Sequence, residues 1–167
     1  MTETGRIIKI VSSRYEVLAA NQERVLCVAM GKLRKAHSPV VGDLVEFERF
    51  ADQNGIQKIL PRKNALVRPS IANVDQAIIV MSCKDPDFST TLIDRLIFSV
   101  CYAGIRPVLC ITKLDLIAEN DAIHEEIQHY IDSGYEVYQS GKGYASEDLI
   151  QALKGNISVL TLSLIHI

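Results

Sequence analysis

The residues best suited to chemistry in this chain lie directly after an apolar run. Residues 107–111 (PVLCI) lead into Thr112-Lys113-Leu114-Asp115. A carboxylate at the end of a strand can accept paired hydrogen bonds from the N1–H and N2–H of guanine, whereas adenine offers no such pair of donors. The lysine stem can lie along the face of a base, and the threonine hydroxyl can tie the loop to its neighbours. Taken alone, the pattern also fits a solvated turn between a strand and a helix.

A second polar turn follows one strand and one helix later in the chain. Gln139-Ser140-Gly141-Lys142 comes directly after the strand expected at residues 135–138. The two turns resemble the [NT]KxD and Ser-Ala/Gly-Lys loops of P-loop GTPases, in which a backbone N–H of the second loop meets guanine O6. An ordinary glycine turn is the alternative. Ligands bind beyond the carboxyl ends of parallel strands, so two such turns on adjacent strands favour a guanine site.

The elements that must position these turns alternate between apolar runs and helical periodicity. Residues 76–82 (QAIIVMS) form a continuous apolar run, which is typical of a strand covered on both faces. Apolar residues then recur at helical spacing from Leu92 to Cys101. Strands are expected next at 107–111, 135–138 and 157–161, with helices at 120–133 and 146–154. This alternation predicts an α/β domain with a mainly parallel sheet and right-handed crossovers.

The first part of the chain has a different pattern and the opposite charge. Residues 1–70 contain 12 Lys and Arg against 7 Asp and Glu, a net charge of +5, whereas residues 71–167 contain 6 against 13, a net charge of −7. The positive part favours an anionic partner such as nucleic acid. Short alternating runs, with Asn54-Gly55 as a hairpin marker, predict a small β-barrel of the oligonucleotide-binding type. Its strands are expected at 6–10, 14–19, 25–29, 43–50 and 55–60.

The composition is that of a folded protein, with 48% apolar residues and a net charge of −2. No segment approaches the roughly 18 apolar residues that a membrane span needs. The cysteines form no CxxC pair, so we expect buried reduced thiols, no disulfide framework and no metal site. We also expect a cytoplasmic location, no membrane partner and a monomer. The cysteines are Cys27, Cys83, Cys101 and Cys110.

Several further motifs resemble one family. The segments RKNALVRP (62–69), IANVDQ (71–76) and DPDFS (85–89) closely resemble the ribosome small-subunit-dependent GTPase A family, and GRIIK (5–9), GKLRK (31–35) and VGDLVE (41–46) resemble its barrel. These are circularly permuted GTPases that assist late maturation of the 30S subunit. The resemblance implies the 30S subunit and 16S rRNA as partners, with GTP or GDP as ligand. It assigns guanine binding to Thr112, Lys113, Asp115, Ser140, Gly141 and Lys142.

A phosphate-binding loop of the form Gly-x-x-x-x-Gly-Lys-Ser/Thr does not occur in the sequence. Neither Gly31-Lys32 nor Gly141-Lys142 completes the pattern. In the family this loop follows the last strand expected here, and Mg²⁺ and Zn²⁺ are implied only for the full-length family, through ligands this sequence lacks. We therefore expect no catalytic residue in this fragment and no GTP turnover by it alone. Residues 162–167 are expected to be a non-native tail.

The sequence thus predicts a barrel over residues 1–65 and a partial, permuted GTPase domain over residues 66–161. The whole is expected to be the N-terminal part of a GTP-hydrolysing factor for 30S maturation. The alternative is a non-enzymatic RNA-binding module with a degenerate nucleotide site. Basic side chains of the barrel are expected to contact rRNA phosphates, with a solvated charged loop as the alternative. These residues are Lys32, Arg34, Lys35, Arg62 and Lys63.

Overall fold

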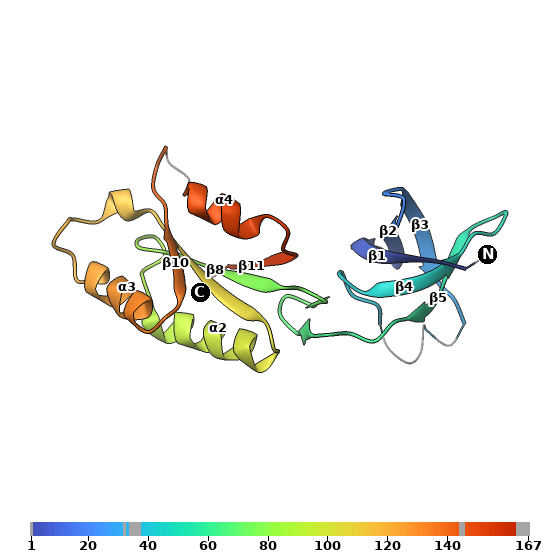
Figure 1. The fold of residues 1–167 in the computed structure, drawn as a ribbon, viewed down its shortest axis with the longest axis horizontal. Helices are drawn as coiled ribbons and strands as arrows, with labels where there is room; N and C mark the ends of the chain where they lie inside the picture. The colour runs from blue at the N-terminus through green and yellow to red at the C-terminus, as the bar shows by residue number, and fades with distance from the viewer. Residues whose placement is uncertain (1, 32, 34–37, 144–145, 163–167) are drawn as a thin grey trace. The chain divides into compact units, whose positions relative to one another are not determined.

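The computed structural model describes residues 2–31, 33, 38–143 and 146–162 (Figure 1). The chain divides into two compact units, Met1–Asn73 and Val74–Ile167. Three of the residues predicted to bind RNA, Lys32, Arg34 and Lys35, lie outside the described residues. The same holds for residues 163–167 of the expected tail, whereas the backbone of Leu162 ends the last strand.

The first unit is a closed barrel with the strand order β1-β2-β3-β5-β4. Pairing of β1 with β4 closes the barrel, and β3 runs parallel to β5 while the other neighbours are antiparallel. This arrangement confirms the predicted oligonucleotide-binding type. The strands are β1 (Thr2–Val11), β2 (Arg14–Ala19), β3 (Arg24–Ala29), β4 (Leu44–Glu48) and β5 (Asn54–Ile59).

The interior of the barrel is filled by every second residue of its strands. Along β2 the side chains of Tyr15, Val17 and Ala19 are buried, as the alternation of the sequence predicts. Phe47 and Ile56 are fully buried opposite them. The expected hairpin is present between β4 and β5, but its connection lies at residues 49–53, and Asn54-Gly55 starts β5.

A short hairpin after the barrel, β6 (Ala65–Leu66) with β7 (Ile71–Ala72), is tied to the first unit by hydrogen bonds. The N–H of Ala72 donates to the carbonyl of Val41 at 2.9 Å. The Arg6 guanidinium donates to the carbonyls of Gly42 at 2.9 Å and Asn73 at 3.2 Å. The expected domain boundary at 65 and 66 lies within β6, and these bonds explain why the first compact unit extends to Asn73.

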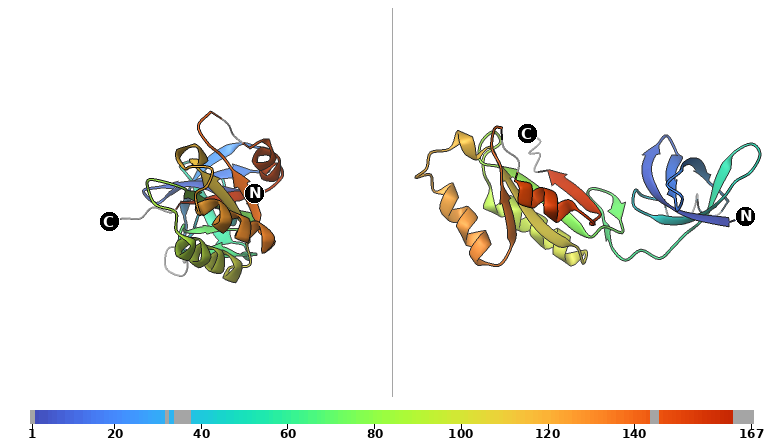
Figure 2. Two further views of the ribbon diagram at one scale, coloured as in Figure 1. Left: turned by 90° about the vertical axis from the view of Figure 1, so that its left-hand side faces the viewer. Right: turned by 45° about the horizontal axis from the view of Figure 1, so that its top comes forward.

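The second unit is a four-stranded parallel sheet in the order β10-β9-β8-β11. Helices α2 and α3 cover one face of the sheet and α4 covers the other (Figures 1 and 2). This confirms the predicted α/β architecture with a parallel sheet. The elements are β8 (Gln76–Ser82), α2 (Thr90–Tyr102), β9 (Arg106–Thr112), α3 (Ile123–Asp132), β10 (Glu136–Gln139), α4 (Glu147–Leu153) and β11 (Ser158–Leu162).

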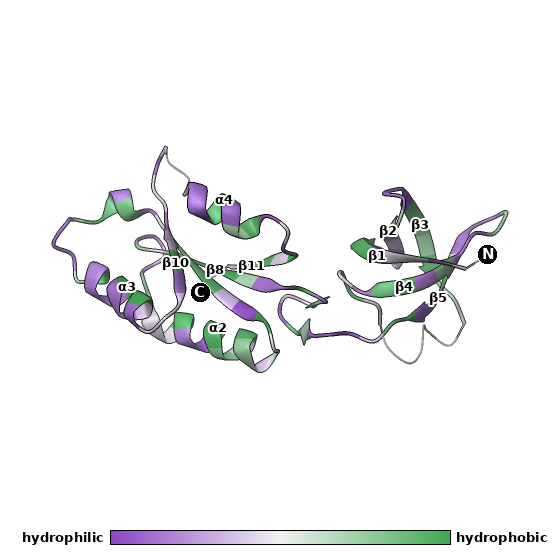
Figure 3. Cartoon of the chain, in the orientation of Figure 1, coloured by the Kyte–Doolittle hydropathy of each residue, from purple (hydrophilic) through white to green (hydrophobic). Residues whose placement is uncertain are grey.

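Helix α2 begins at a serine cap and buries one apolar stripe. The hydroxyl oxygen of Ser89 accepts from the N–H of Leu92 at 3.3 Å, and Ile93, Ile97 and Val100 are buried against the sheet. Figure 3 shows hydrophobic and hydrophilic residues alternating along this helix. Cys101 lies about 100° around the helix from Val100 and is exposed, so the expectation that all four thiols are buried was wrong at this position.

Candidate guanine-binding site

The two predicted turns lie side by side at the carboxyl edge of the sheet. β9 ends at Thr112, and β10 ends at Gln139, which pairs with Ile111 in the parallel register. The N–H of Ser140 continues this pairing by donating to the carbonyl of Ile111 at 2.8 Å. The register therefore brings the segment after Thr112 to the same level as the turn that begins at Ser140.

Asp115 joins the two turns directly. It lies in a short 3₁₀ helix, η1 (Leu114–Leu116), and its Oδ1 accepts a hydrogen bond from the backbone N–H of Lys142 at 2.9 Å. The N–H of Leu114 donates to the carbonyl of Ser140 at 3.4 Å. The carboxylate of Asp115 is exposed rather than turned into the interior. It can therefore meet a ligand while it holds the second turn in place.

Lys113 is held across the end of the neighbouring strand. Its backbone has a φ of 62°, a left-handed conformation that is uncommon for a residue with a side chain and is concentrated at functional sites. Its Nζ donates to the carbonyl of Lys84 at 3.1 Å and also to the carbonyl of Asp85. The hydroxyl of Thr112 donates to the carbonyl of Met81 at 3.4 Å, so the first turn is anchored both to β8 and to the segment that follows it.

The segment after β8 is a part of this edge that sequence reasoning did not assign to the site. Lys84 and Asp85 contribute through backbone carbonyls, which leave no mark in the residue types. Three of the six Lys and Arg residues in 71–167, namely Lys84, Lys113 and Lys142, lie at this edge. Asp85 and Asp115 lie at the same edge, so cations and carboxylates are interspersed there.

The thiols close to this edge are not nucleophiles. Burial raises the pKa of Cys83, which directly follows β8, and of Cys110 in β9. Both therefore remain protonated at neutral pH. Among the residues that the structure describes, no group of three or more His, Cys, Asp or Glu could hold a metal ion.

Arg62, predicted to contact RNA, is bound within the barrel unit. Its Nε donates to Oδ1 of Asp43 at 2.7 Å and its Nη2 donates to Oδ2 at 2.8 Å, while Asp43 is fully buried. This paired hydrogen bonding raises the pKa of Arg62. Lys63 is exposed, and its backbone N–H donates to Oδ1 of Asn73 at 2.8 Å. The guanidinium of Arg62 therefore has a structural partner already.

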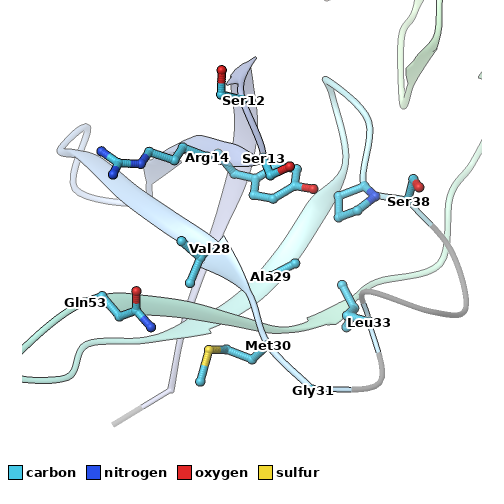
Figure 4. Close-up of a pocket in the computed structure, with 12 residues that line it drawn as sticks. Ser12, Ser13, Arg14, Val28, Ala29, Met30, Gly31, Leu33, Ser38 and Gln53 are labelled. Carbon is cyan, nitrogen blue, oxygen red and sulfur yellow. The ribbon is translucent and has the colours of Figure 1, made fainter.

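The barrel surface carries two further cations that lie beside cavities. A cavity of about 650 Å³ has Ser12 and Ser13 on one side and Met30 and Gln53 on the other, with Arg14 at its border (Figure 4). A second cavity, of about 590 Å³, is lined by Lys9 and Arg14 on the outer face of β1 and β2. Both side chains are exposed, and Arg14 was not among the predicted RNA contacts.

No helix in the described part of the chain is long and apolar enough to cross a membrane. The barrel, the parallel sheet and the two joined turns define the class of protein as a GTPase-like domain preceded by an oligonucleotide-binding barrel. Comparison with protein families agrees with this class. Residues 59–162 match the RsgA GTPase model and residues 4–56 match the RsgA N-terminal domain model. This chain belongs to the RsgA GTPase family.

Named relatives are identical to this chain at about two-fifths of the aligned positions. It is 47% identical over 137 residues to "Small ribosomal subunit biogenesis GTPase RsgA 2" of Oceanobacillus iheyensis, covering 80% of this chain and 46% of that protein. It is 37% identical over 156 residues to the RsgA of Streptococcus pneumoniae, covering 93% and 52% respectively. The chain therefore spans about half the length of the curated relatives it matches.

Solved structures of two relatives share the fold. YloQ, described as a circularly permuted GTPase, matches with a TM-score of 0.80 and 34% identity, over 97% of this chain and 60% of that chain. YjeQ from Thermotoga maritima matches with a TM-score of 0.82 and 31% identity, over 96% and 60%. The barrel and the sheet described above are therefore those of this family.

Proposed function

We propose that the edge formed by residues 112–115 and 140–142 recognises the guanine of GTP or GDP. In this proposal the chain is the base-reading part of a GTPase that acts in biogenesis of the small ribosomal subunit. The observation that carries the proposal is the hydrogen bond from the Lys142 N–H to Asp115, which unites two turns far apart in sequence around one exposed carboxylate. The names of the relatives point to the same class of reaction.

The proposed chemistry of base recognition follows from the donors and acceptors at this edge. A carboxylate offers about four lone-pair positions, so Asp115 can keep its bond to Lys142 and still accept the N1–H and N2–H of guanine. The N–H of Gly141 is assigned to O6, and glycine allows the close approach of a base. The stem of Lys113, fixed at its far end by Lys84 and Asp85, provides an apolar platform for the ring.

Discrimination against adenine has a physical cause. Adenine presents no N1–H and no 2-amino group, so the Asp115 carboxylate would face the N1 lone pair and would receive no donor from the base. Acceptor positions of a carboxylate that are covered by a base but left without a donor cost about 1–3 kcal/mol or more. GTP and GDP are therefore expected to bind in preference to ATP and ADP.

Hydrolysis itself depends on groups that hold the phosphates and the metal ion. Since the sequence contains no Gly-x-x-x-x-Gly-Lys-Ser/Thr pattern, the described residues are assigned recognition and not catalysis. This chain alone is expected to bind guanine nucleotides weakly and to release no phosphate from GTP. Turnover, with Mg²⁺, belongs in this proposal to a full-length family member.

The barrel is assigned the RNA contact. The net charge of +5 in residues 1–70 supports this assignment, as do the exposed side chains of Lys9 and Arg14. The partner that fits the family is 16S rRNA in the 30S subunit. Because phosphate contacts release counterions, the affinity of the chain for RNA is expected to fall steeply as salt is raised. Affinity that does not change with salt would contradict the assignment.

Nuclear magnetic resonance of the ¹⁵N-labelled chain tests the guanine site directly. Addition of GDP is expected to shift the amide resonances of Gly141 and Lys142, while the same concentration of ADP leaves them in place. The Asp115→Ala variant should lose the GDP response, and Glu119→Gln, which changes another exposed carboxylate, should keep it. No response to either nucleotide, with RNA binding retained, would instead favour a non-enzymatic RNA-binding module.

A further inference from the structure

An exposed aromatic pair on α2 lies one helical turn from an acidic pocket between α2 and α3. From this arrangement we propose that the surface binds a basic protein segment, which places an arginine side chain in the pocket and apolar residues on the aromatic pair. The surface lies on the helical face of the sheet that α2 and α3 cover (Figure 1). It uses none of the residues assigned above to guanine or RNA.

The aromatic pair is Phe98 and Tyr102. Phe98 is 73% exposed and Tyr102 is 87% exposed, and their rings stack with centroids 6.2 Å apart and an interplanar angle of 18°. Rings this exposed are uncommon on a surface that has no partner, and large exposed apolar groups that occur together mark interaction sites. The two residues are four positions apart on α2 and therefore share one side of the helix.

Among the described residues this side of α2 is uncovered, because α3 contacts only the other end of the helix. The hydroxyl of Tyr130 in α3 donates its one proton to Oδ1 of Asp94 at 2.7 Å, and its oxygen lies 3.3 Å from the carbonyl oxygen of Thr90. These contacts lie in the N-terminal half of α2, and α3 ends at Asp132. Figures 1 and 2 both show the C-terminal half of α2 extending beyond α3.

The pocket at the junction of the two helices has a volume of about 320 Å³. Carboxylates of Asp94 and Glu126 line it, together with the rings of Tyr130 and Tyr135, which meet edge to face. The Oδ1 atom of Asp94 accepts from Tyr130, and a carboxylate retains further acceptor positions. Acidic oxygens beside aromatic faces are the surroundings that a guanidinium fits, through paired hydrogen bonds and cation–π contact.

The negative charge of α2 and α3 favours a positively charged partner. Asp94, Glu125, Glu126 and Asp132 are exposed, and the only Lys or Arg in α2 and α3 is Arg95. Such a surface repels RNA and anionic lipid and attracts a basic protein segment. Asp94, Phe98 and Tyr102 follow one another at intervals of four along α2. A partner whose arginine enters the pocket thus has its neighbouring residues placed over the rings.

The test uses the full chain and a fluorescein-labelled peptide of alternating arginine and leucine. The double substitution Phe98→Ser and Tyr102→Ser is expected to weaken peptide binding by about tenfold, the effect of removing hot-spot aromatics. Both side chains are exposed, so the fold should survive. Two matched controls should stay within about twofold: Val11→Ser with Leu26→Ser, exposed apolar residues of the barrel, and Glu147→Gln with Asp148→Asn in α4.

A variant of the peptide serves as a further control. Replacement of its arginines by citrulline, which removes the charge and keeps the shape, should abolish binding. If the α2 and α4 variants lost peptide affinity equally, the peptide would be binding to acidic surfaces in general, and the proposal would be overturned. It would also be overturned if the α2 substitutions weakened RNA binding instead, or if they abolished self-association of the chain, which would identify a second copy as the occupant.

Discussion

The carboxylate of Asp115 accepts a hydrogen bond from the backbone N–H of Lys142 at 2.9 Å. One acidic side chain thus fixes the turn that follows the neighbouring strand. The parallel register of β9 with β10 makes the contact possible, because it places Thr112 and Ser140 at the same edge. Any loss of this carboxylate is therefore expected to change both base recognition and the position of the second turn.

The ion pair between Arg62 and Asp43 predicts that Arg62 supports the barrel. Asp43 is fully buried, so removal of its guanidinium partner leaves a buried charge with one fewer partner. Arg62→Ala is expected to lower the free energy of unfolding in urea by about 3 kcal/mol. Lys58→Ala, at an exposed cation of β5, should change it by less than about 0.5 kcal/mol. Unchanged stability of Arg62→Ala with weakened RNA binding would assign Arg62 to the RNA contact instead.

Gly42 is predicted to tolerate no side chain. Its φ is 91°, and a Cβ atom there would lie 1.9 Å from the carbonyl oxygen of Ala72. Gly42→Ala is expected to cost at least about 3 kcal/mol of unfolding free energy, through a backbone clash and a left-handed conformation. Gly104→Ala shares the positive φ but meets no atom within 4 Å, and should cost about 1 kcal/mol. Similar thermal midpoints for the two variants would contradict the close approach.

Thiol labelling under native conditions is expected to modify Cys101 first. Cys101 is exposed, while Cys27, Cys83 and Cys110 are buried. Burial also raises the pKa of Cys27 to about 11, which leaves almost no thiolate at neutral pH. A chromogenic disulfide reagent should therefore show one fast phase that Cys101→Ser removes. A fast phase that persists in this variant would show that a second thiol is accessible.

Lowering the pH is expected to destabilise the barrel, because it protonates Glu23. Arg49 donates to both carboxylate oxygens of Glu23, at 2.9 and 2.8 Å, and this lowers the pKa of Glu23 from 4.5 to about 2. The stabilising effect is complete above pH 4.5 and is lost as the pH falls from 4.5 towards 2. Urea denaturation across this window should show a steeper loss for the parent chain than for Glu23→Gln. Equal slopes would mean that the ion pair does not contribute in solution.

The elements were predictable where periodicity alone determines them. β2 has the predicted bounds because its side chains alternate strictly between the barrel interior and solvent. The guanine-binding turns could also be found, since they follow apolar runs that become β9 and β10. Cys101 was misplaced because it adjoins the buried stripe of α2 without belonging to it. Helical periodicity identifies a stripe but not its borders.

Contacts between distant residues were not predictable in the same way. In the sequence nothing distinguishes Arg62 from an unpaired basic residue. Its partner, the buried carboxylate of Asp43, is brought to it only by the fold. The anchoring of Lys113 by the carbonyls of Lys84 and Asp85 leaves no signal in residue types, since every residue has a carbonyl. The pocket between α2 and α3 likewise depends on where α3 ends relative to α2.

The most direct test of the central claim is a substitution of Asp115 that should change which base the site prefers. In Asp115→Asn the amide presents one acceptor and one donor in place of two acceptors, which suits the N1–H and the C2 carbonyl of xanthine. Titration of the parent chain and the variant with GDP and with xanthosine diphosphate should show a preference for GDP that the substitution reverses. A folded variant that still prefers GDP as strongly as the parent chain would contradict the assignment of Asp115 to guanine.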